Sequence, residues 1–183
     1  MSKRKATTTP RMGSVALARE VSAVEKDGFI VDIDESDITV WTVALEPRLL
    51  RQHGLGGTLV VDLARWARMV KKPEALVLEV RFPSSYPRDP PFVRVVRPRF
   101  AAYTGHVTAG GSICTELLTS SGWRCDMTVS SMLRTVCEGF RDGDGRIQFE
   151  GSLYGNDYEL VEAEVAFDRA LLTHGWRAPR RGL

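Results

Sequence analysis

The side chain with the strongest nucleophilic chemistry in this sequence is the cysteine at position 114. Cys114 stands in the run AGGSICTELL, directly after two glycines and outside any periodic helix or strand that we can assign. A cysteine thiolate is a strong nucleophile, so Cys114 is the candidate catalytic residue. Free cysteines are also among the most buried residues, so packing between Ile113 and Leu117 is the alternative role.

The other cysteines and histidines give weaker signals. Cys137 falls on the apolar face of a predicted helix, where we expect it to pack in the core, and Cys125 lies in a predicted loop. The three cysteines and three histidines show neither a CxxC pair nor zinc-finger spacing, so the sequence predicts no metal site. His106 precedes Cys114 by eight residues and remains a candidate for a supporting role.

The composition is that of a globular protein. Of 183 residues, 43% are apolar and 26% charged, and this length suits one domain. Basic residues gather at the ends, four within 1–12 and three within 177–183, which leaves 18 basic against 23 acidic residues between them. We therefore expect no broad nucleic-acid-binding face. We expect no membrane span, because no apolar run is long enough. Three cysteines without a secretory signal indicate an intracellular protein, cytoplasmic, nuclear or both.

Hydrophobic periodicity predicts the elements that must position these side chains. Apolar residues recur at helical spacing over 14–26 and predict a helix. Alternating residues at 29–33, the turn DESD and the β-branched run ITVWTVAL predict an antiparallel hairpin. Residues 47–57 contain three glycines and are predicted to form a loop. The further predicted elements are a helix over 58–70 capped by Thr58, strands over 76–82 and 92–96, a helix from 128 or 129 to the turn RDGDG, and a last helix over 157–174.

A proline-rich connector separates the last two predicted strands. Its sequence FPSSYPRDPPF has four prolines within nine residues, and proline cannot donate to a sheet ladder, so we expect a rigid link. Residues 97–125, which contain Cys114, are irregular and interrupted by glycines. The order helix, strands, irregular centre, helices predicts an α+β fold with an antiparallel sheet.

Taken together, these motifs resemble the ubiquitin-conjugating enzymes. In that family a YPxxPP connector precedes the fourth strand, the catalytic cysteine follows in a Gly-x-Ile-Cys context, and a tryptophan comes eight or nine residues later. The sequence is most similar to the Q-type branch over residues 13–179. The four motifs of that branch are DPPFVRVV, GG-x-[IL]-C-x-ELLT-x-x-GW, R-[IV]-Q-F and a terminal GW, here at Asp89–Val96, Gly110–Trp123, Arg146–Phe149 and Gly175–Trp176.

The resemblance implies a ubiquitin-conjugating-enzyme-like fold: a four-stranded antiparallel sheet flanked by helices, with an extra helix between the second and third strands. The resemblance covers a single catalytic domain (13–179). It leaves a basic arm (1–12), which its polar composition predicts to be disordered, and a basic tail (180–183). It implies that Cys114 accepts ubiquitin from an activating enzyme as a thioester and passes it to a substrate amine. The implied partners are ubiquitin, the activating enzyme, a ubiquitin ligase and a protein substrate, with no cofactor and no metal.

The sequence departs from the common family pattern around the cysteine. Most of the family carries a His-Pro-Asn tripeptide upstream, whereas this region reads YTGHVTAGG. The Q-type branch also lacks the tripeptide, so the donor that would stabilise the oxyanion is open, with backbone amides of Gly110–Ile113 as candidates. His106 would position or deprotonate the acceptor amine, or brace the loop, or have no role.

Three further positions carry expectations from the resemblance. Trp123 is predicted to be a packing anchor. Asp142 and Asp144 follow a helix where relatives often carry an acidic residue near the incoming lysine, and a solvated turn is the alternative. Arg88 stands in the connector where many relatives have an apolar residue that faces the ligase.

Two other functions stay open at this point. One is a catalytically silent member of the same fold that binds ubiquitin or another partner, although such variants normally lose the cysteine that this chain retains. The other is a cysteine hydrolase that uses Cys114 and His106, for which no third, orienting residue is evident.

Overall fold

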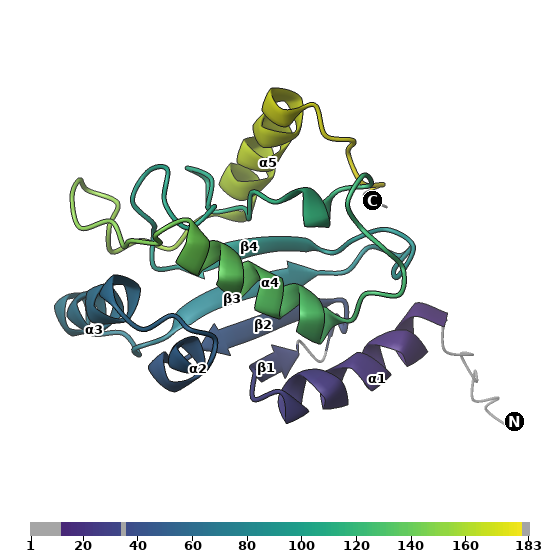
Figure 1. Cartoon of the computed structure of the whole chain (residues 1–183), viewed down its shortest axis with the longest axis horizontal. Helices are drawn as coiled ribbons and strands as arrows, with labels where there is room; N and C mark the ends of the chain where they lie inside the picture. The colour runs from purple at the N-terminus through teal and green to yellow at the C-terminus, as the bar shows by residue number, and fades with distance from the viewer. Residues whose placement is uncertain (1–11, 34–35, 181–183) are drawn as a thin grey trace, which may run out of the picture.

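The structure is a computed structural model that describes residues 12–33 and 36–180 (Figure 1). The predicted basic arm, apart from Met12, lies outside the described residues, as do residues 181–183 of the predicted tail. One antiparallel sheet has the strand order β1-β2-β3-β4. Its strands are β1 (Ile30–Ile33), β2 (Val40–Leu45), β3 (Leu76–Arg81) and β4 (Phe92–Arg97). The helices are α1 (Met12–Lys26), α2 (Pro47–Gln52), α3 (Thr58–Val70), the short 3-10 helix η1 (Glu116–Leu118), α4 (Val129–Asp142) and α5 (Leu160–His174).

This architecture confirms the predicted fold class, including the extra helix α3 between the second and third strands. The predicted hairpin is also confirmed, since Val31 pairs with Val43 and Ile33 with Trp41 in antiparallel register. Figure 1 shows α4 lying across the sheet, with α1, α2 and α3 along the lower edge of the view and α5 apart at the top.

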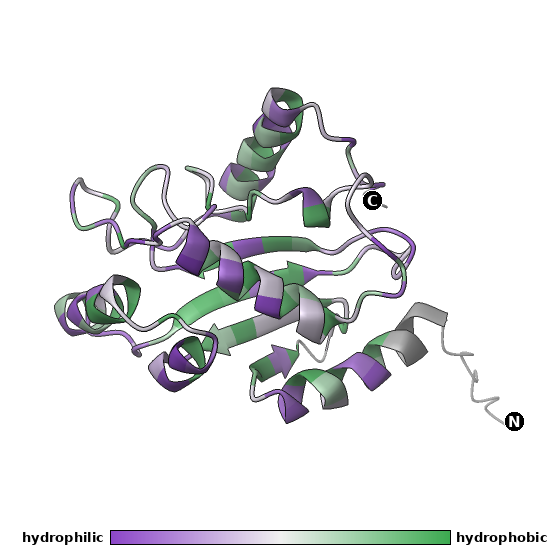
Figure 2. Cartoon of the chain, viewed as in Figure 1, coloured by the Kyte–Doolittle hydropathy of each residue, from purple (hydrophilic) through white to green (hydrophobic). Residues whose placement is uncertain are grey.

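The core forms where α4 covers the sheet. In β2 alternate side chains, Trp41, Val43 and Leu45, are fully buried, as the alternation in the sequence predicts. Burying an aliphatic side chain such as Val43 or Leu45 stabilises the fold by roughly 1.5–3 kcal/mol. Opposite them α4 buries one apolar face, and Figure 2 shows polar residues on its outward side. Thr128 caps α4 by accepting a hydrogen bond from the Ser131 amide at 3.1 Å.

Three predictions about the helices are wrong: a missed helix, a cap residue and the start of the last helix. Pro47–Gln52 is a helix and not a loop, because Pro47 at the first turn favours helix and Leu49 and Leu50 bury their side chains in the core. Gly57, and not Thr58, takes the cap position of α3. The last helix begins at Leu160, because Glu159 and Glu162 form a capping box that fixes its first turn.

The proline-rich connector is anchored by Trp123. Its indole Nε1 donates to the carbonyl oxygen of Pro87 at 2.8 Å, and its ring lies 6.3 Å from that of Tyr86. Tyr86 in turn contacts Phe82 edge to face. The predicted packing role of Trp123 is therefore confirmed, and the connector is tied to the loop that follows Cys114.

Candidate active site

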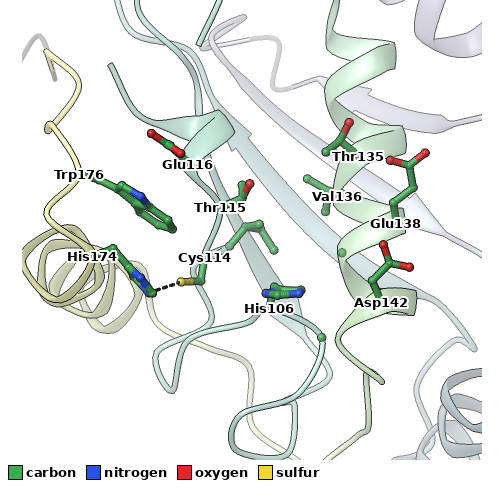
Figure 3. Close-up of a pocket in the computed structure, with 13 residues that line it drawn as sticks. His106, Cys114, Thr115, Glu116, Thr135, Val136, Glu138, Asp142, His174 and Trp176 are labelled. Atoms are coloured by element: carbon green, nitrogen blue, oxygen red, sulfur yellow. Dashed lines mark hydrogen bonds between the residues drawn. The ribbon is translucent and has the colours of Figure 1, made fainter. Parts of the chain in front are cut away.

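A cleft of about 460 Å³ opens beside Cys114, between α4 and the end of α5 (Figure 3). Sequence reasoning placed two of its polar residues, His106 and Asp142, near the cysteine, and the structure brings both to this cleft. The other ionisable side chains that line it are Glu116, Glu138 and His174.

The backbone of Cys114 is held by the irregular segment that follows β4. Its amide donates to the carbonyl oxygen of His106 at 2.8 Å, and Val107 and Ile113 form an isolated antiparallel bridge next to it. The Ile113 amide donates to Val93 of β4 at 3.1 Å. These bonds place a half-buried Cys114 side chain at the wall of the cleft.

The two glycines before Cys114 allow close packing. A Cβ on Gly110 would lie 2.2 Å from the carbonyl oxygen of Glu162 in α5, and a Cβ on Gly111 would lie 2.6 Å from the Tyr158 ring. Gly111 also has a φ of +94°, which disfavours any side chain. The paired glycines therefore let this segment and α5 meet without a gap.

Two of the four amides predicted as oxyanion donors in Gly110–Ile113 are already engaged, and so is the amide of Cys114. The Gly111 amide donates to Thr108 at 2.9 Å and the Ile113 amide to Val93 at 3.1 Å. The amide of Cys114 itself donates to His106. An amide in such a bond is not free to receive a developing oxyanion, so these three groups do not form an oxyanion hole in this conformation.

His174, which sequence reasoning missed, has the ring nearest to the cysteine. Its Nε2 lies 3.6 Å from Cys114 Sγ, and its ring stacks on Trp176 with centroids 4.3 Å apart. Gly175 ends α5 in the left-handed conformation, with a φ of +67°, and this turn brings Trp176 back over the imidazole. The terminal GW motif was the only signal in the sequence, and it did not indicate which side chain it would orient.

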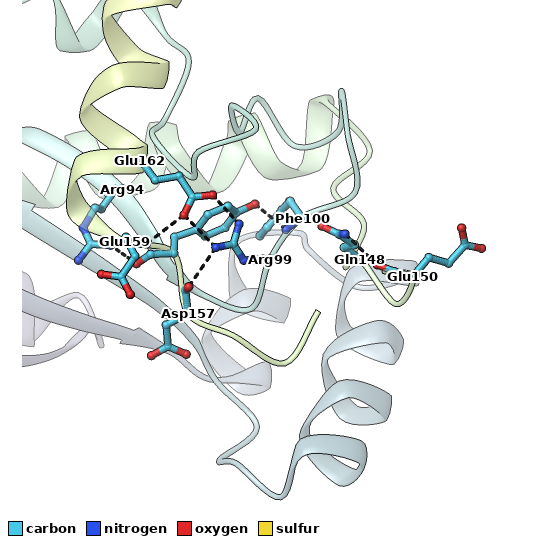
Figure 4. A network of polar contacts seen from close by, with 9 residues as sticks. Arg94, Arg99, Phe100, Gln148, Glu150, Asp157, Glu159 and Glu162 are labelled. Atoms are coloured by element: carbon cyan, nitrogen blue, oxygen red, sulfur yellow. Dashed lines mark hydrogen bonds and ion pairs between the residues drawn. The ribbon is translucent and has the colours of Figure 1, made fainter. Parts of the chain in front are cut away.

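The start of α5 is fixed by a buried arginine, far from His174 along the helix (Figure 4). Arg99 donates to both carboxylate oxygens of Glu162, at 2.6 and 2.8 Å, and to the carbonyl oxygen of Asp157 at 3.1 Å. Arg94 donates to the carbonyl oxygen of Tyr158 at 2.7 Å. These contacts join α5 to β4 and the segment after it, and so determine where its last residue points.

His106 contributes mainly through its backbone. It adopts a φ of +53°, and its carbonyl oxygen accepts the Cys114 amide hydrogen bond. Its exposed ring lies over the end of α4, where a Cβ on Gly143 would come within 2.9 Å of Cδ2. Among the described residues no hydrogen bond joins the His106 ring to Cys114, so bracing of the loop is the role with direct structural support.

The opposite wall of the cleft is acidic. Glu138 and Asp142 extend from α4 on that wall, whereas Glu116 lies on the side of Cys114, beside Trp176 (Figure 3). Asp142 accepts a hydrogen bond from the Arg141 guanidinium at 2.8 Å. Asp144 is not in this wall and lines a different hollow next to the start of α3. The acidic wall suits a cationic acceptor such as a lysine ammonium.

Comparison with known proteins is decisive for the family. The family model of ubiquitin-conjugating enzymes matches residues 71–147. The mouse ubiquitin-conjugating enzyme E2 Q-like protein 1 is 35% identical over 122 residues, which are 64% of this chain and 74% of the relative. The chain belongs to the ubiquitin-conjugating enzyme family. The mouse ubiquitin-conjugating enzyme E2 Q1 is 34% identical over 107 residues, 57% of this chain but only 24% of that longer protein.

Solved ubiquitin-conjugating enzymes show the same fold. Human ubiquitin-conjugating enzyme E2 G1 superposes with a TM-score of 0.53 and 20% identity, over 74% of this chain and 99% of that one. An enzyme from Plasmodium falciparum gives a TM-score of 0.52 and 19% identity, over 76% and 93% of the two chains.

In this family member the RIQF motif supports the fold and not the cleft. Ile147 bridges to Phe100 and is buried, and Arg146 pairs with Asp62 of α3 at 2.7 Å. Phe149 lies under the Arg65 guanidinium, 4.3 Å from its carbon. The motif therefore fixes α3 against the segment after β4.

The three cysteines of this protein differ in their surroundings. Burial raises the pKa of the Cys137 thiol to about 12, with the Glu138 charge adding to the effect. Burial also raises the pKa of Cys114, which nevertheless faces the cleft. Cys125 is exposed and does not line the cleft. A raised pKa disfavours the thiolate, so Cys114 benefits from a base beside it.

Within the described residues, no group of three or more metal-ligating side chains is close enough together to hold a metal ion. Over the same residues, no helix combines the length and the apolar character that crossing a membrane demands.

Proposed function

We propose that the chain is an active ubiquitin-conjugating enzyme that carries ubiquitin as a thioester on Cys114 and transfers it to a substrate amine. The observation that carries this proposal is the position of Cys114 Sγ, half-buried at the wall of a cleft and 3.6 Å from His174 Nε2. A nucleophile within reach of a base is the arrangement that covalent catalysis requires.

Loading is a thioester exchange. The Cys114 thiol gives its proton to His174, and the thiolate attacks the C-terminal carbonyl carbon of ubiquitin on the activating enzyme. The carbon–sulfur bond to the activating enzyme breaks, and that thiolate takes up a proton. One thioester replaces another, so the step is balanced without a metal, a cofactor or an oxidant.

Discharge uses the acidic wall. A substrate lysine arrives as a cation, and the charges of Glu116, Glu138 and Asp142 attract it to the cleft. The ammonium first gives one proton to solvent, and the neutral nitrogen attacks the thioester carbonyl carbon. The carbon–sulfur bond breaks and the Cys114 thiolate leaves, and it takes up the second proton that the nitrogen loses as the amide forms. Protonated His174 stabilises this leaving thiolate by charge and hydrogen bonding. The amides of Gly111, Ile113 and Cys114 are engaged, so the remaining candidate donors to the oxyanion are the amides of Gly110 and Ser112 and the protonated His174 Nε2.

The partners that this reaction needs are ubiquitin, an activating enzyme, a ubiquitin ligase and a protein substrate. We place the single catalytic domain at residues 13–179, where the resemblance to the family lies. A reactive free thiol suits the reducing cytoplasm or nucleus, where we expect the protein to act.

The test is a loading reaction with activating enzyme, ATP and ubiquitin, analysed on a non-reducing gel. The parent chain and the matched variants Cys125→Ala and Cys137→Ala should gain one ubiquitin in a bond that thiol reductant cleaves. Cys114→Ala should gain none, and Cys114→Ser should form an ester that survives the reductant. Loading of Cys114→Ala, or its loss in Cys125→Ala alone, would contradict the assignment. An intact parent chain that never loads would indicate a silent, binding member of the fold.

A further inference from the structure

A hollow of about 360 Å³, separate from the cleft and from the hollow at Asp144, is lined by three arginines. Arg88 comes from the proline-rich connector, and Arg177 and Arg180 come from the segment after α5. The remaining lining residues are Ser85, Asp89, Ser120 and Ala178. We call this hollow the arginine pocket.

The walls of the arginine pocket are held by hydrogen bonds. The amide of Ser120 donates to the Arg177 carbonyl oxygen at 3.1 Å, and its hydroxyl donates to that of Ala178 at 3.0 Å. On the other side, the connector is tied down by the bond from Trp123 to Pro87. Two segments far apart in the sequence are thus fixed to the same loop, so the arginines do not depend on a chance arrangement of free ends.

The charges of the arginine pocket are not neutralised within the protein. Across residues 12–33 and 36–180, no carboxylate lies within ion-pair distance of Arg88, Arg177 or Arg180. By contrast, the three arginines that follow at Arg94, Arg97 and Arg99 each pair with a carboxylate. All three pocket arginines are exposed, against a single acidic residue, Asp89, in the same lining. The Ser85 hydroxyl, buried in this wall, also lacks a hydrogen-bond partner among the described residues.

We propose that the arginine pocket docks an acidic segment of a partner protein, whose side-chain oxyanions pair with the three guanidinium groups. A guanidinium presents several N–H donors in a planar fork that matches the oxygens of a carboxylate or a phosphoryl group. This docking rests on the proposed function in one respect, because it takes the partner to be a ligase or a substrate of ubiquitin transfer.

The distribution of positive charge on the surface favours a protein segment over a nucleic acid as the partner. A nucleic acid requires a basic stripe that follows many phosphates. Here the unpaired cations gather in one hollow, and residues 13–176 contain 18 basic against 23 acidic residues. A local cluster of this kind suits a few acidic side chains presented by a folded or extended partner.

The arginine pocket and the active-site cleft are lined by neighbouring residues of the same two segments. Arg177 directly follows Trp176, which stacks on His174 and lines the cleft. Ser120 lies only six residues after Cys114. A partner docked on the arginines would therefore sit beside the segment that orients His174.

The test measures binding to the full, unloaded chain by fluorescence anisotropy. The probes are labelled peptides of consecutive glutamates, the same length of phosphoserines, and a neutral glutamine peptide as reference. The triple variant R88Q/R177Q/R180Q removes the three cations of the arginine pocket. The matched variant R48Q/R51Q/R68Q removes the same net charge from exposed arginines of α2 and α3.

We expect the acidic peptides to bind the parent chain and the pocket variant to bind them roughly tenfold or more weakly. The matched variant should stay within about twofold of the parent, because distant exposed charges are screened by salt. The ratio between the glutamate and phosphoserine arms identifies which oxyanion the pocket prefers.

Three outcomes would overturn the proposal: no binding of either acidic peptide, equal loss in both triple variants, or tighter binding of a single-stranded oligonucleotide of equal charge. Circular dichroism of each variant confirms that the fold is kept, and single substitutions replace the triple variant if it is not. Because binding is measured on unloaded protein, a failure here leaves the loading reaction of Cys114 untouched. A failure of that reaction likewise leaves this measurement interpretable.

Discussion

The Nε2 of His174 lies 3.6 Å from the Sγ of Cys114, although sixty residues separate the two along the chain. The pair forms only because α5 is fixed at its start by Arg99 and Glu162, and because Gly110 lets the segment before Cys114 approach the helix. The candidate nucleophile and its base are therefore brought together by tertiary structure and not by a local motif.

Replacement of His174 should slow chemistry at Cys114 without unfolding the chain. The exposed imidazole contributes little packing, so His174→Ala should leave the melting temperature within about 1–2 °C. Loss of a proton acceptor beside the thiol should slow ubiquitin loading and discharge by roughly 10²–10⁴-fold. Single-turnover gels of both steps measure the effect. Rates equal to the parent would show that the His174–Cys114 contact has no catalytic consequence.

The pH dependence of thiol alkylation should report the burial of Cys114. Burial raises the pKa of this thiol above its ordinary value of 9.0, so the thiolate fraction at neutral pH is lower than that of a free cysteine. In a Cys125→Ser background, the rate of iodoacetamide alkylation should rise with pH to a midpoint above that value. Cys137 does not interfere, because it is buried. A midpoint below the ordinary value would mean that a positive charge at the site outweighs burial.

The Arg99–Glu162 ion pair should make the free energy of unfolding depend on pH. The hydrogen bond from Arg99 holds the pKa of Glu162 below its ordinary value of 4.5. The stabilisation is therefore fully present above that value and is lost as the pH falls through the lower folded pKa. Glu162→Gln, which can still serve the capping box, leaves Arg99 without a charged partner and should lower the free energy of unfolding by about 1–3 kcal/mol at pH 7.

Urea unfolding at pH 7 and at pH 3 measures this difference between the parent and Glu162→Gln. The gap should shrink as the pH falls through the lowered pKa of Glu162, because the carboxylate of the parent is then progressively protonated. A gap that is the same at both pH values would show that the pair has no pH-dependent part.

The sequence predicted the sheet and the long helices because their apolar residues repeat at strand or helical spacing over many positions. Pro47–Gln52 was missed because six residues are too few to show a period, and their helix depends on the burial of Leu49 and Leu50. Cys114 was found because a local motif surrounds it. His174 was not found, because nothing in the sequence near it indicates a contact with Cys114. Only the assembled fold creates that contact.

His106→Ala should have a small effect on both steps. Its carbonyl oxygen, which accepts the Cys114 amide hydrogen bond, is kept by alanine, and its exposed ring has no hydrogen bond to Cys114 among the described residues. We expect loading and discharge to stay within about threefold of the parent, well short of the loss that follows removal of a general base. Discharge slowed by about a hundredfold with normal loading would instead assign the acceptor's proton to His106.

The loop that holds Cys114 should be sensitive to a single methyl group at Gly143. A Cβ there would lie 2.9 Å from both Cδ2 and the amide nitrogen of His106 and 3.0 Å from the Gly105 Cα. Backbone atoms cannot move aside cheaply, so Gly143→Ala should lower the free energy of unfolding by about 1–3 kcal/mol. The shift should also strain the hydrogen bond from the Gly105 amide to the Gly143 carbonyl oxygen, which is 2.7 Å long.

Gly56→Ala is the matched control, because no atom lies within 4 Å of its added Cβ. Urea unfolding and thioester loading should both be impaired in Gly143→Ala and close to the parent in Gly56→Ala. The two effects should occur together, since the His106 carbonyl oxygen that moves with the loop is the acceptor for the Cys114 amide. A destabilised Gly143→Ala chain that loads at the parental rate, at a temperature where it remains folded, would show that the loop does not position Cys114.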